Sequence, residues 1–169
     1  MLILGLDPGT VNYGFALLYS ENNPKLTKYG SITVSKTKTL SERLHVIHEK
    51  LEQLIINNHP NEIAIEKPFL GNKEKQFFHS SLAIGQAQAI AFIIAGKYNI
   101  PVFQYAPTLV KYSITNYGNA KKEQVQIMIK NIFNIEEAIQ EDTADAIGVA
   151  VCHSYNQKSA KIYHERKIN

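Results

Sequence analysis

The sequence predicts a single α/β domain built on a five-stranded mixed sheet. Two patterns indicate this fold class: three β-type segments separated only by short turns open the chain, and helical and β-type segments alternate after residue 39. The length supports it, since 169 residues are enough for one domain with a substantial core. We expect three antiparallel strands followed by parallel strands, with helices flanking the sheet.

The three opening strands are predicted over residues 1–7, 13–20 and 26–35. These segments are rich in apolar, β-branched and aromatic residues, whereas Pro8-Gly9-Thr10 and Asn22-Asn23-Pro24 are typical of turns. Because the connections are short, neighbouring strands should pair in an antiparallel meander.

A helix and a fourth strand follow the meander. Thr39 and Glu42 form a capping-box pattern, apolar residues then recur at helical spacing, and Pro60 ends the helix. The next strand covers residues 62–66. Since a helix of crossover length separates it from the first strand, the two should lie parallel.

The second half of the chain continues this alternation. Helices are predicted over residues 73–97 and 121–133, a fifth strand over residues 101–106, and a short helix or loop over residues 107–117. A last helix starts near Glu141 and should be largely buried, because small and apolar residues dominate it.

The domain is expected to cover residues 1–157. Residues 158–169 are polar and basic, and we interpret this tail as a frayed helix end or a disordered arm. The sequence shows neither an apolar run of membrane-spanning length nor an export-signal pattern, and Cys152 is its single cysteine. We therefore expect a cytoplasmic protein that does not contact membranes. The net charge of +3 is compatible with nucleic acid but does not establish it.

Four acidic residues stand where the predicted fold makes them informative. Asp7 and Glu66 end two strands, and Asp142 and Asp145 lie three residues apart on one helix face. Each has a local alternative: Asp7 could cap its turn, Glu66 could face solvent, and Asp142 could cap the helix with Asp145 completing a box-like cap.

The topology favours a joint role for these carboxylates. The carboxyl ends of parallel neighbours meet at one sheet edge, and a helix packed across that edge would add two further acidic groups. Four converging carboxylates repel one another unless cations hold them, and oxygen ligands suit Mg²⁺ or Mn²⁺. Two such ions are the usual arrangement for displacement at phosphorus.

Basic and aromatic residues accompany this pattern. Four lysines against Glu123 give residues 107–130 a net charge of +3; they are Lys111, Lys121, Lys122 and Lys130. They could form a solvated face, or contact the backbone of a nucleic acid and stabilise charge on a phosphoryl group. Phe69 follows the predicted strand end at Glu66, where it could pack in the core or stack on a base.

The same residues resemble the Holliday-junction resolvase family RuvC over about residues 1–156. Five short motifs in a fixed order carry the resemblance: Asp7-Pro8-Gly9-Thr10, Ile65-Glu66-x-x-Phe69, Gly85-Gln86-Ala87, Ala120-Lys121-Lys122 and Asp142-x-x-Asp145-Ala146. The resemblance implies a ribonuclease-H-like fold and an endonuclease that resolves four-way DNA junctions during recombination and repair. It also implies a homodimer that makes paired nicks with 5′-phosphate ends.

The resemblance further implies roles for individual residues. The catalytic metal ligands would be Asp7, Glu66, Asp142 and Asp145, holding two Mg²⁺ ions that Mn²⁺ can replace. Lys111 and Lys122 match basic positions near the scissile phosphate and would join the catalytic set. Expected DNA contacts are Phe69, Lys73, Lys111, Lys121 and Lys122.

Partners and location follow from the same resemblance. A homodimer matches a two-fold junction that needs two cuts, and the helix covering residues 77–95 is the candidate interface. A branch-migration motor is a further candidate partner. The location would be the nucleoid, or the host cytoplasm if a phage encodes the chain.

The sequence also departs from the family pattern, and other functions stay open. Gln88-Ala89 stand where the cellular family often has Arg-Gly, so a phosphate contact could be lost. Three alternatives remain: a related nuclease acting on structured or branched RNA or DNA, a phosphate- or nucleotide-binding module similar to sugar kinases, and a non-catalytic junction binder.

Overall fold

The structure is a computed structural model that describes residues 1–67 and 75–168, with side chains described over residues 1–67 and 82–157. Five strands form the sheet of this described part, in the order β3-β2-β1-β4-β5. Their bounds are Leu2–Asp7 for β1, Asn12–Tyr19 for β2, Lys25–Thr33 for β3, Glu62–Glu66 for β4 and Val102–Tyr105 for β5.

The strand pairing confirms the predicted mixed sheet. β1 and β2 pair antiparallel, as do β2 and β3, which makes the opening meander. β4 pairs parallel to β1 and to β5. The strands β1, β3, β4 and β5 therefore all end at the same edge of the sheet.

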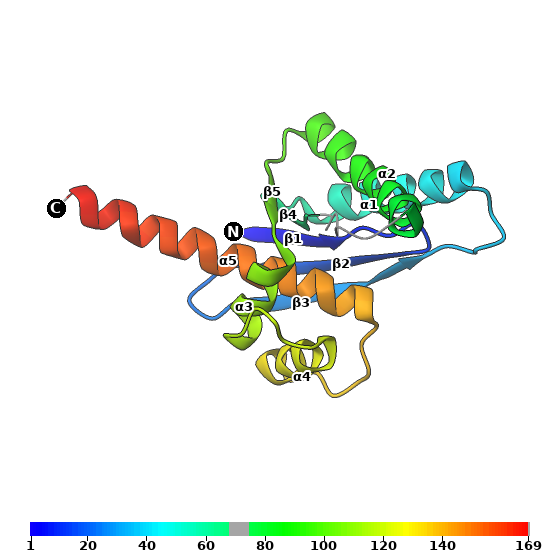
Figure 1. Ribbon diagram of the computed structural model, residues 1–169. Helices are drawn as coiled ribbons and strands as arrows, with labels where there is room; N and C mark the ends of the chain where they lie inside the picture. Colours follow the sequence, from blue (N-terminus) through cyan, green and yellow to red (C-terminus); the bar gives the residue numbers. More distant parts are fainter. Residues whose placement is uncertain (68–74, 169) are drawn as a thin grey trace.

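Helices cover the two faces of the sheet as separate layers (Figure 1). One layer contains α1 and α2, and the other contains α3, α4 and α5. Their bounds are Leu40–Asn58 for α1, Lys75–Tyr98 for α2, Pro107–Thr115 for α3, Lys122–Phe133 for α4 and Glu141–Ile168 for α5.

The alternation of residues along β1 explains how two helical layers share one strand. Leu2, Leu4 and Leu6 belong to the core on the α1–α2 side, whereas Ile3 belongs to the core on the α5 side. Gly5 lets α5 approach the strand closely, since a Cβ at this position would come 2.3 Å from the carbonyl oxygen of Ala146. The last helix thus packs directly on the central strand.

Local sequence signals set the helix boundaries. The predicted capping box of α1 is confirmed: Glu42 N–H donates to Thr39 Oγ1 and Thr39 N–H donates to Glu42 Oε2. The segment 107–117, predicted as a short helix or loop, contains α3, which begins at Pro107 in the position that proline favours.

The last helix extends beyond the predicted domain boundary. The backbone of α5 continues as a helix past residue 157 to Ile168. The part beyond residue 157 projects away from the sheet (Figure 1). The division into a domain of residues 1–157 and a tail stays a prediction. None of the described helices combines the length and apolar content of a membrane span.

Candidate active site

Two of the predicted acidic residues end neighbouring parallel strands. Asp7 is the last residue of β1 and Glu66 the last of β4, and the pairing of Leu6 with Ile65 places them side by side. Each lies two residues beyond a residue that packs on the α5 side, Gly5 in β1 and Ala64 in β4. Both carboxyl groups therefore belong to the α5 face of one sheet edge, and both residues are half-buried.

The first turns of α5 supply the other two acidic residues. Gly14 of β2 pairs with Asp7, and a Cβ at Gly14 would lie 1.9 Å from the carbonyl oxygen of Asp142. The start of α5 thus lies against the strand pair that carries Asp7. Because α5 begins at Glu141, Asp142 lies inside the first turn, and the alternative that it caps the helix is wrong.

Electrostatics show that these side chains form one cluster. Burial, followed by the charges of Asp145, Asp142 and Glu66, raises the pKa of Asp7 to about 8. Burial and then the charge of Asp145 raise the pKa of Glu66 to about 7. Burial also raises the pKa of Asp145, with Asp142 adding to the rise and Lys122 opposing it. The local explanations for single carboxylates therefore do not account for this mutual interaction.

Two of the predicted lysines reach the cluster from the α3–α4 side. The charge of Lys122, at the start of α4, opposes the rise in the pKa of Asp7, Glu66 and Asp145. Lys111 of α3 acts in the same direction on Glu66 and Asp145. Lys122 also forms an ion pair with Glu141 in the first turn of α5.

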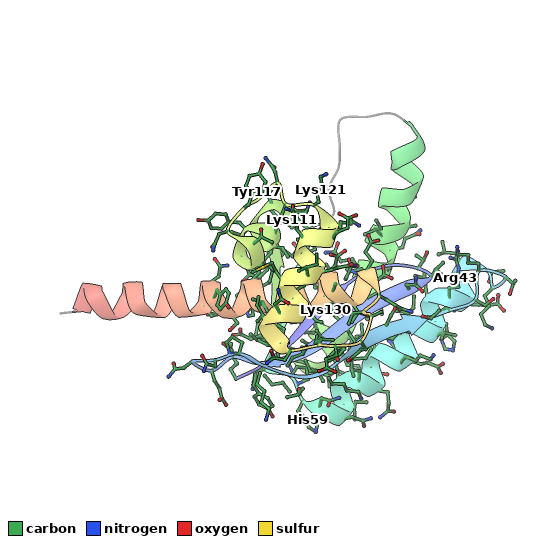
Figure 2. The ribbon with its side chains drawn as sticks, turned by 90° about the horizontal axis from the view of Figure 1, so that it is seen from below. Arg43, His59, Lys111, Tyr117, Lys121 and Lys130 are labelled. Carbon is green, nitrogen blue, oxygen red and sulfur yellow. The ribbon has the colours of Figure 1, made fainter. Side chains whose placement is uncertain are left out.

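Three other residues were predicted to contact DNA. Lys121 precedes α4 and is exposed, and Figure 2 shows it on the same layer as Lys111. The charge of Lys121 does not contribute to the pKa shifts of Asp7, Glu66 and Asp145. Phe69 and Lys73 lie outside the described residues.

The chemistry of the cluster fits divalent cations. The four carboxylates supply only oxygen donors, and burial together with the neighbouring negative charges raises the pKa of Asp7, Glu66 and Asp145 despite the opposing lysines. Among the side chains described, those of residues 1–67 and 82–157, no group of three acidic, histidine or cysteine residues is already arranged to hold an ion.

Three further residues lie beside the site although the sequence did not predict that position for them. Arg43 of α1 donates from Nη1 to Thr10 Oγ1, 3.2 Å away, in the turn that follows Asp7. Gln88 is buried in α2, and its amide lies 3.5 Å from the carbonyl oxygen of Glu66 rather than at a surface. Tyr13 is buried, and the charge of Asp7 adds to the effect of burial in raising its pKa. Of these three, only Arg43 could have been singled out from the sequence, because it is one of two arginines in the chain and directly follows Glu42 of the capping box.

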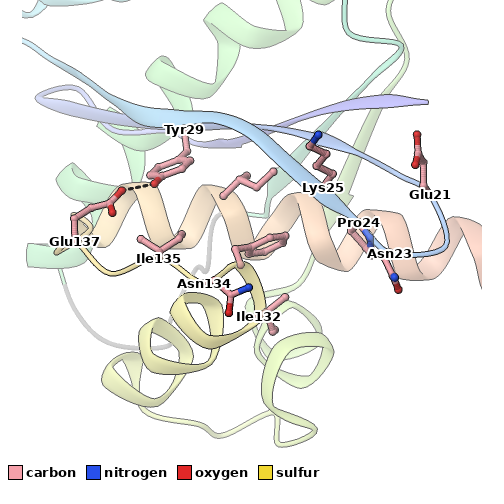
Figure 3. A pocket seen from close by; sticks show the side chains of 11 residues that line it. Glu21, Asn23, Pro24, Lys25, Tyr29, Ile132, Asn134, Ile135 and Glu137 are labelled. Atoms are coloured by element: carbon pink, nitrogen blue, oxygen red, sulfur yellow. Dashed lines mark hydrogen bonds between the residues drawn. The ribbon is translucent and has the colours of Figure 1, made fainter.

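A cavity of about 480 Å³ lies elsewhere in the molecule (Figure 3). It opens between the β2–β3 hairpin and the segment joining α4 to α5, and Lys25, Tyr29, Ile135 and Glu137 are among its lining residues. Tyr29 donates a hydrogen bond to Glu137 across one side of it. None of the four clustered carboxylates lines this cavity, so it is separate from the acidic site.

The fold and the site together define a class: a ribonuclease-H-like nuclease that depends on metal ions. The family model described as crossover junction endodeoxyribonuclease RuvC matches residues 3–153. The chain belongs to the RuvC family.

Relatives and solved structures agree with this membership. The RuvC of Alkaliphilus oremlandii is 34% identical over 165 residues, which cover 96% of this chain and 98% of the relative. The RuvC of Dehalococcoides mccartyi strain BAV1 is 38% identical over 155 residues, covering 90% of each chain. The structure of T. thermophilus RuvC in complex with Holliday junction substrate has a TM-score of 0.85 at 24% identity, over 95% of this chain and 96% of that one. At that identity the structural match establishes the ribonuclease-H-like fold.

Proposed function

We propose that this protein is a Mg²⁺-dependent endonuclease that resolves four-way DNA junctions by paired phosphodiester hydrolysis. The observation that carries the proposal is the convergence of Asp7, Glu66 and Asp145 at one sheet edge. The charge of Asp145 raises the pKa of both Asp7 and Glu66, and the charge of Glu66 also raises that of Asp7. Burial raises the pKa of all three residues. Family membership supplies the substrate class. The reaction would serve recombination and repair on the nucleoid in the cytoplasm.

The four carboxylates would hold two Mg²⁺ ions, with Mn²⁺ able to replace them. Asp7 and Glu66 approach from the sheet, and Asp142 and Asp145 from α5, so the ions would lie between two rigid elements. When bound, such ions generate a nucleophilic water at neutral pH and stabilise charge on the phosphoryl oxygens. The carboxylates would position that chemistry at the end of the sheet.

Lys111 and Lys122 would act directly on the phosphate. Both exert their charge on the carboxylate cluster from the α3–α4 side, so a phosphate bound there would lie close to both ammonium groups. They would stabilise the negative charge that develops during cleavage. Lys122 would then exchange its ion pair with Glu141 for the phosphate.

Phe69, Lys73 and Lys121 are proposed to contact the DNA. Phe69 follows Glu66 closely in sequence, so its ring would meet bases next to the cleavage site. The two lysines would add backbone affinity that falls with salt concentration. These roles rest on the family resemblance, together with the exposure of Lys121.

We also propose a homodimer that forms through α2. Leu82, Phe92 and Ile93 are exposed on this helix, Ile93 by 64%, and a Cβ at Gly85 or Gly96 would have no atom within 4 Å. Such an apolar face with small residues suits close packing against a second copy. A two-fold dimer would place one active site on each of two symmetry-related strands. A branch-migration motor is a further proposed partner.

A cleavage assay with mapped products tests this function. A four-way DNA junction, labelled on one strand at a time, is incubated with and without Mg²⁺, and a linear duplex and a structured RNA serve as controls. We expect symmetric nicks with 5′-phosphate ends only in the junction and only with the ion. Cleavage of the RNA but not the junction would overturn the proposed substrate.

A further inference from the structure

The turn after the catalytic strand is tied to the opposite helical layer by an arginine. Arg43 lies in the first turns of α1, is half-buried, and donates from Nη1 to Thr10 Oγ1 at 3.2 Å. Thr10 is three residues beyond Asp7. The guanidinium therefore belongs to the surroundings of the active site although it comes from the layer that does not carry Asp142 and Asp145.

The edge geometry places Arg43 across the carboxylates from the other basic groups. β3 ends at the same edge as β1, Val34 N–H bonds to the carbonyl of Val11, and α1 begins shortly afterwards. Lys111 and Lys122 approach the cluster from the other face of the sheet. Figure 2 shows Arg43 on α1, well separated from Lys111. Basic groups thus flank the acidic site on both sides.

The guanidinium has unused hydrogen-bonding capacity. Among the described residues, Arg43 Nε is buried without an acceptor, and no carboxylate forms an ion pair with this side chain. A buried donor without a partner is costly, and a guanidinium has five donors that match the oxygens of a phosphate. Lys36 and Lys38, both exposed in the loop before α1, add positive charge nearby.

Arg43 does not belong to the reacting centre itself. The pKa shifts of Asp7, Glu66 and Asp145 have no contribution from Arg43, whereas Lys122 contributes to all three. A phosphate held by Arg43 is therefore not the one attacked.

We propose that Arg43, oriented by Thr10, binds a backbone phosphate of the cleaved strand that flanks the scissile phosphate. The cleaved strand would run from the Lys111–Lys122 side, across the carboxylates, to α1. The guanidinium would turn its unpaired donors to the phosphate oxygens and fix the register of the strand over the site. This inference rests on the proposed action on DNA junctions and adds a binding residue to it.

Neutral phosphate analogues test the contact directly. Junctions that carry a single methylphosphonate at successive positions around the mapped cut are bound, without divalent ions, to the wild type and to Arg43→Gln. Lys50→Gln, which removes one exposed charge from the same helix, is the matched control. Folding of each variant is checked by its melting curve, and Arg43→Met, which also removes the charge, replaces Arg43→Gln if that variant does not fold.

The result we expect is a coupling at one flanking phosphate. Neutralising it should weaken wild-type and Lys50→Gln binding roughly tenfold, the effect of one charge-assisted hydrogen-bonded contact, but weaken Arg43→Gln binding less than about twofold. The salt slope of Arg43→Gln should also fall by about one unit. Equal losses in the wild type and the variant at every phosphate would overturn the proposal. A wild type that neither binds nor cuts the unmodified junction would instead contradict the proposed function.

Discussion

Gly14 and Asp142 are in backbone contact. A Cβ built on Gly14 would lie 1.9 Å from the carbonyl oxygen of Asp142 and 2.5 Å from its carbonyl carbon. Gly14 has a negative φ, so this contact, and not an unusual backbone conformation, makes the position require glycine. The contact brings the first turn of α5, with two of the four carboxylates, onto the strand pair that carries Asp7.

Gly14→Ala should therefore impair catalysis more than it impairs folding. The added methyl group must push the start of α5 away, which costs about 1–3 kcal/mol of stability. A displacement of about 1 Å in the acidic cluster would lower the cleavage rate roughly a hundredfold. The single-turnover rate of junction cleavage measures the loss of catalysis, and urea denaturation in a separate experiment measures the loss of stability. Gly30→Ala is the control, because its Cβ would meet only the Phe15 ring, at 3.3 Å. Wild-type-like cleavage by Gly14→Ala would refute the packing argument.

The sequence was sufficient to predict where the strands that carry Asp7 and Glu66 end, but not how α5 reaches them. Asp7 and Glu66 follow apolar strands directly, and parallel strands end at one edge, so their proximity followed from topology. The contact between Gly14 and Asp142 joins segments far apart in the chain, and no local pattern encodes it. Similarly, the sequence indicated that Gln88-Ala89 could cost a phosphate contact, but it did not predict that Gln88 would be buried with its amide toward the carbonyl of Glu66.

The interior polar contacts of α5 were also beyond prediction. His153 is fully buried, with Nε2 2.5 Å from Glu62 Oε2 and Nδ1 2.5 Å from the Tyr105 hydroxyl. His153 lies in a largely apolar helix, and Glu62 begins a strand 91 residues earlier in the chain. Only the packing of α5 across β4 and β5 brings these groups together.

His153→Ala should destabilise the fold strongly. The substitution removes a buried ring and leaves the Glu62 carboxylate and the Tyr105 hydroxyl without that partner, which should cost about 2–4 kcal/mol. Urea denaturation followed by circular dichroism measures the loss. His45→Ala is the control, because His45 pairs with Glu49 in an exposed position where the expected loss is below about 0.5 kcal/mol. Equal stability of the two variants would contradict the role of the buried pair.

The stability of the metal-free protein should fall as the pH rises from about 5 to 8. The pKa of Asp7 is about 8 and that of Glu66 about 7, both above their ordinary values. In this range the folded protein holds protons that the unfolded chain has released, so stability present at low pH is lost as the pH approaches these values. Melting temperatures in EDTA measure the trend. Asp7→Asn should show a flatter profile than the wild type, and parallel profiles would show that Asp7 does not contribute.

The proposed dimer should depend on the exposed face of α2. Ile93→Glu places a charge in a face that would be buried between two copies, so self-association should weaken by roughly a hundredfold. Sedimentation velocity over a range of concentrations measures this effect. Ile127→Glu is the control, since Ile127 is similarly exposed, by 58%, but lies on α4. Dimers of unchanged strength in Ile93→Glu would exclude this helix as the interface.

The central claim is that the clustered carboxylates carry out metal-dependent cleavage, and Asp7→Asn tests it most directly. Junction binding and junction nicking are measured on the same protein with Mg²⁺, with Glu49→Gln, an exposed site on α1, as the control. We predict binding near that of the wild type and nicking reduced roughly a thousandfold or more, because ions at this site supply several kcal/mol of charge stabilisation. Nicking by Asp7→Asn at the wild-type rate would contradict the account.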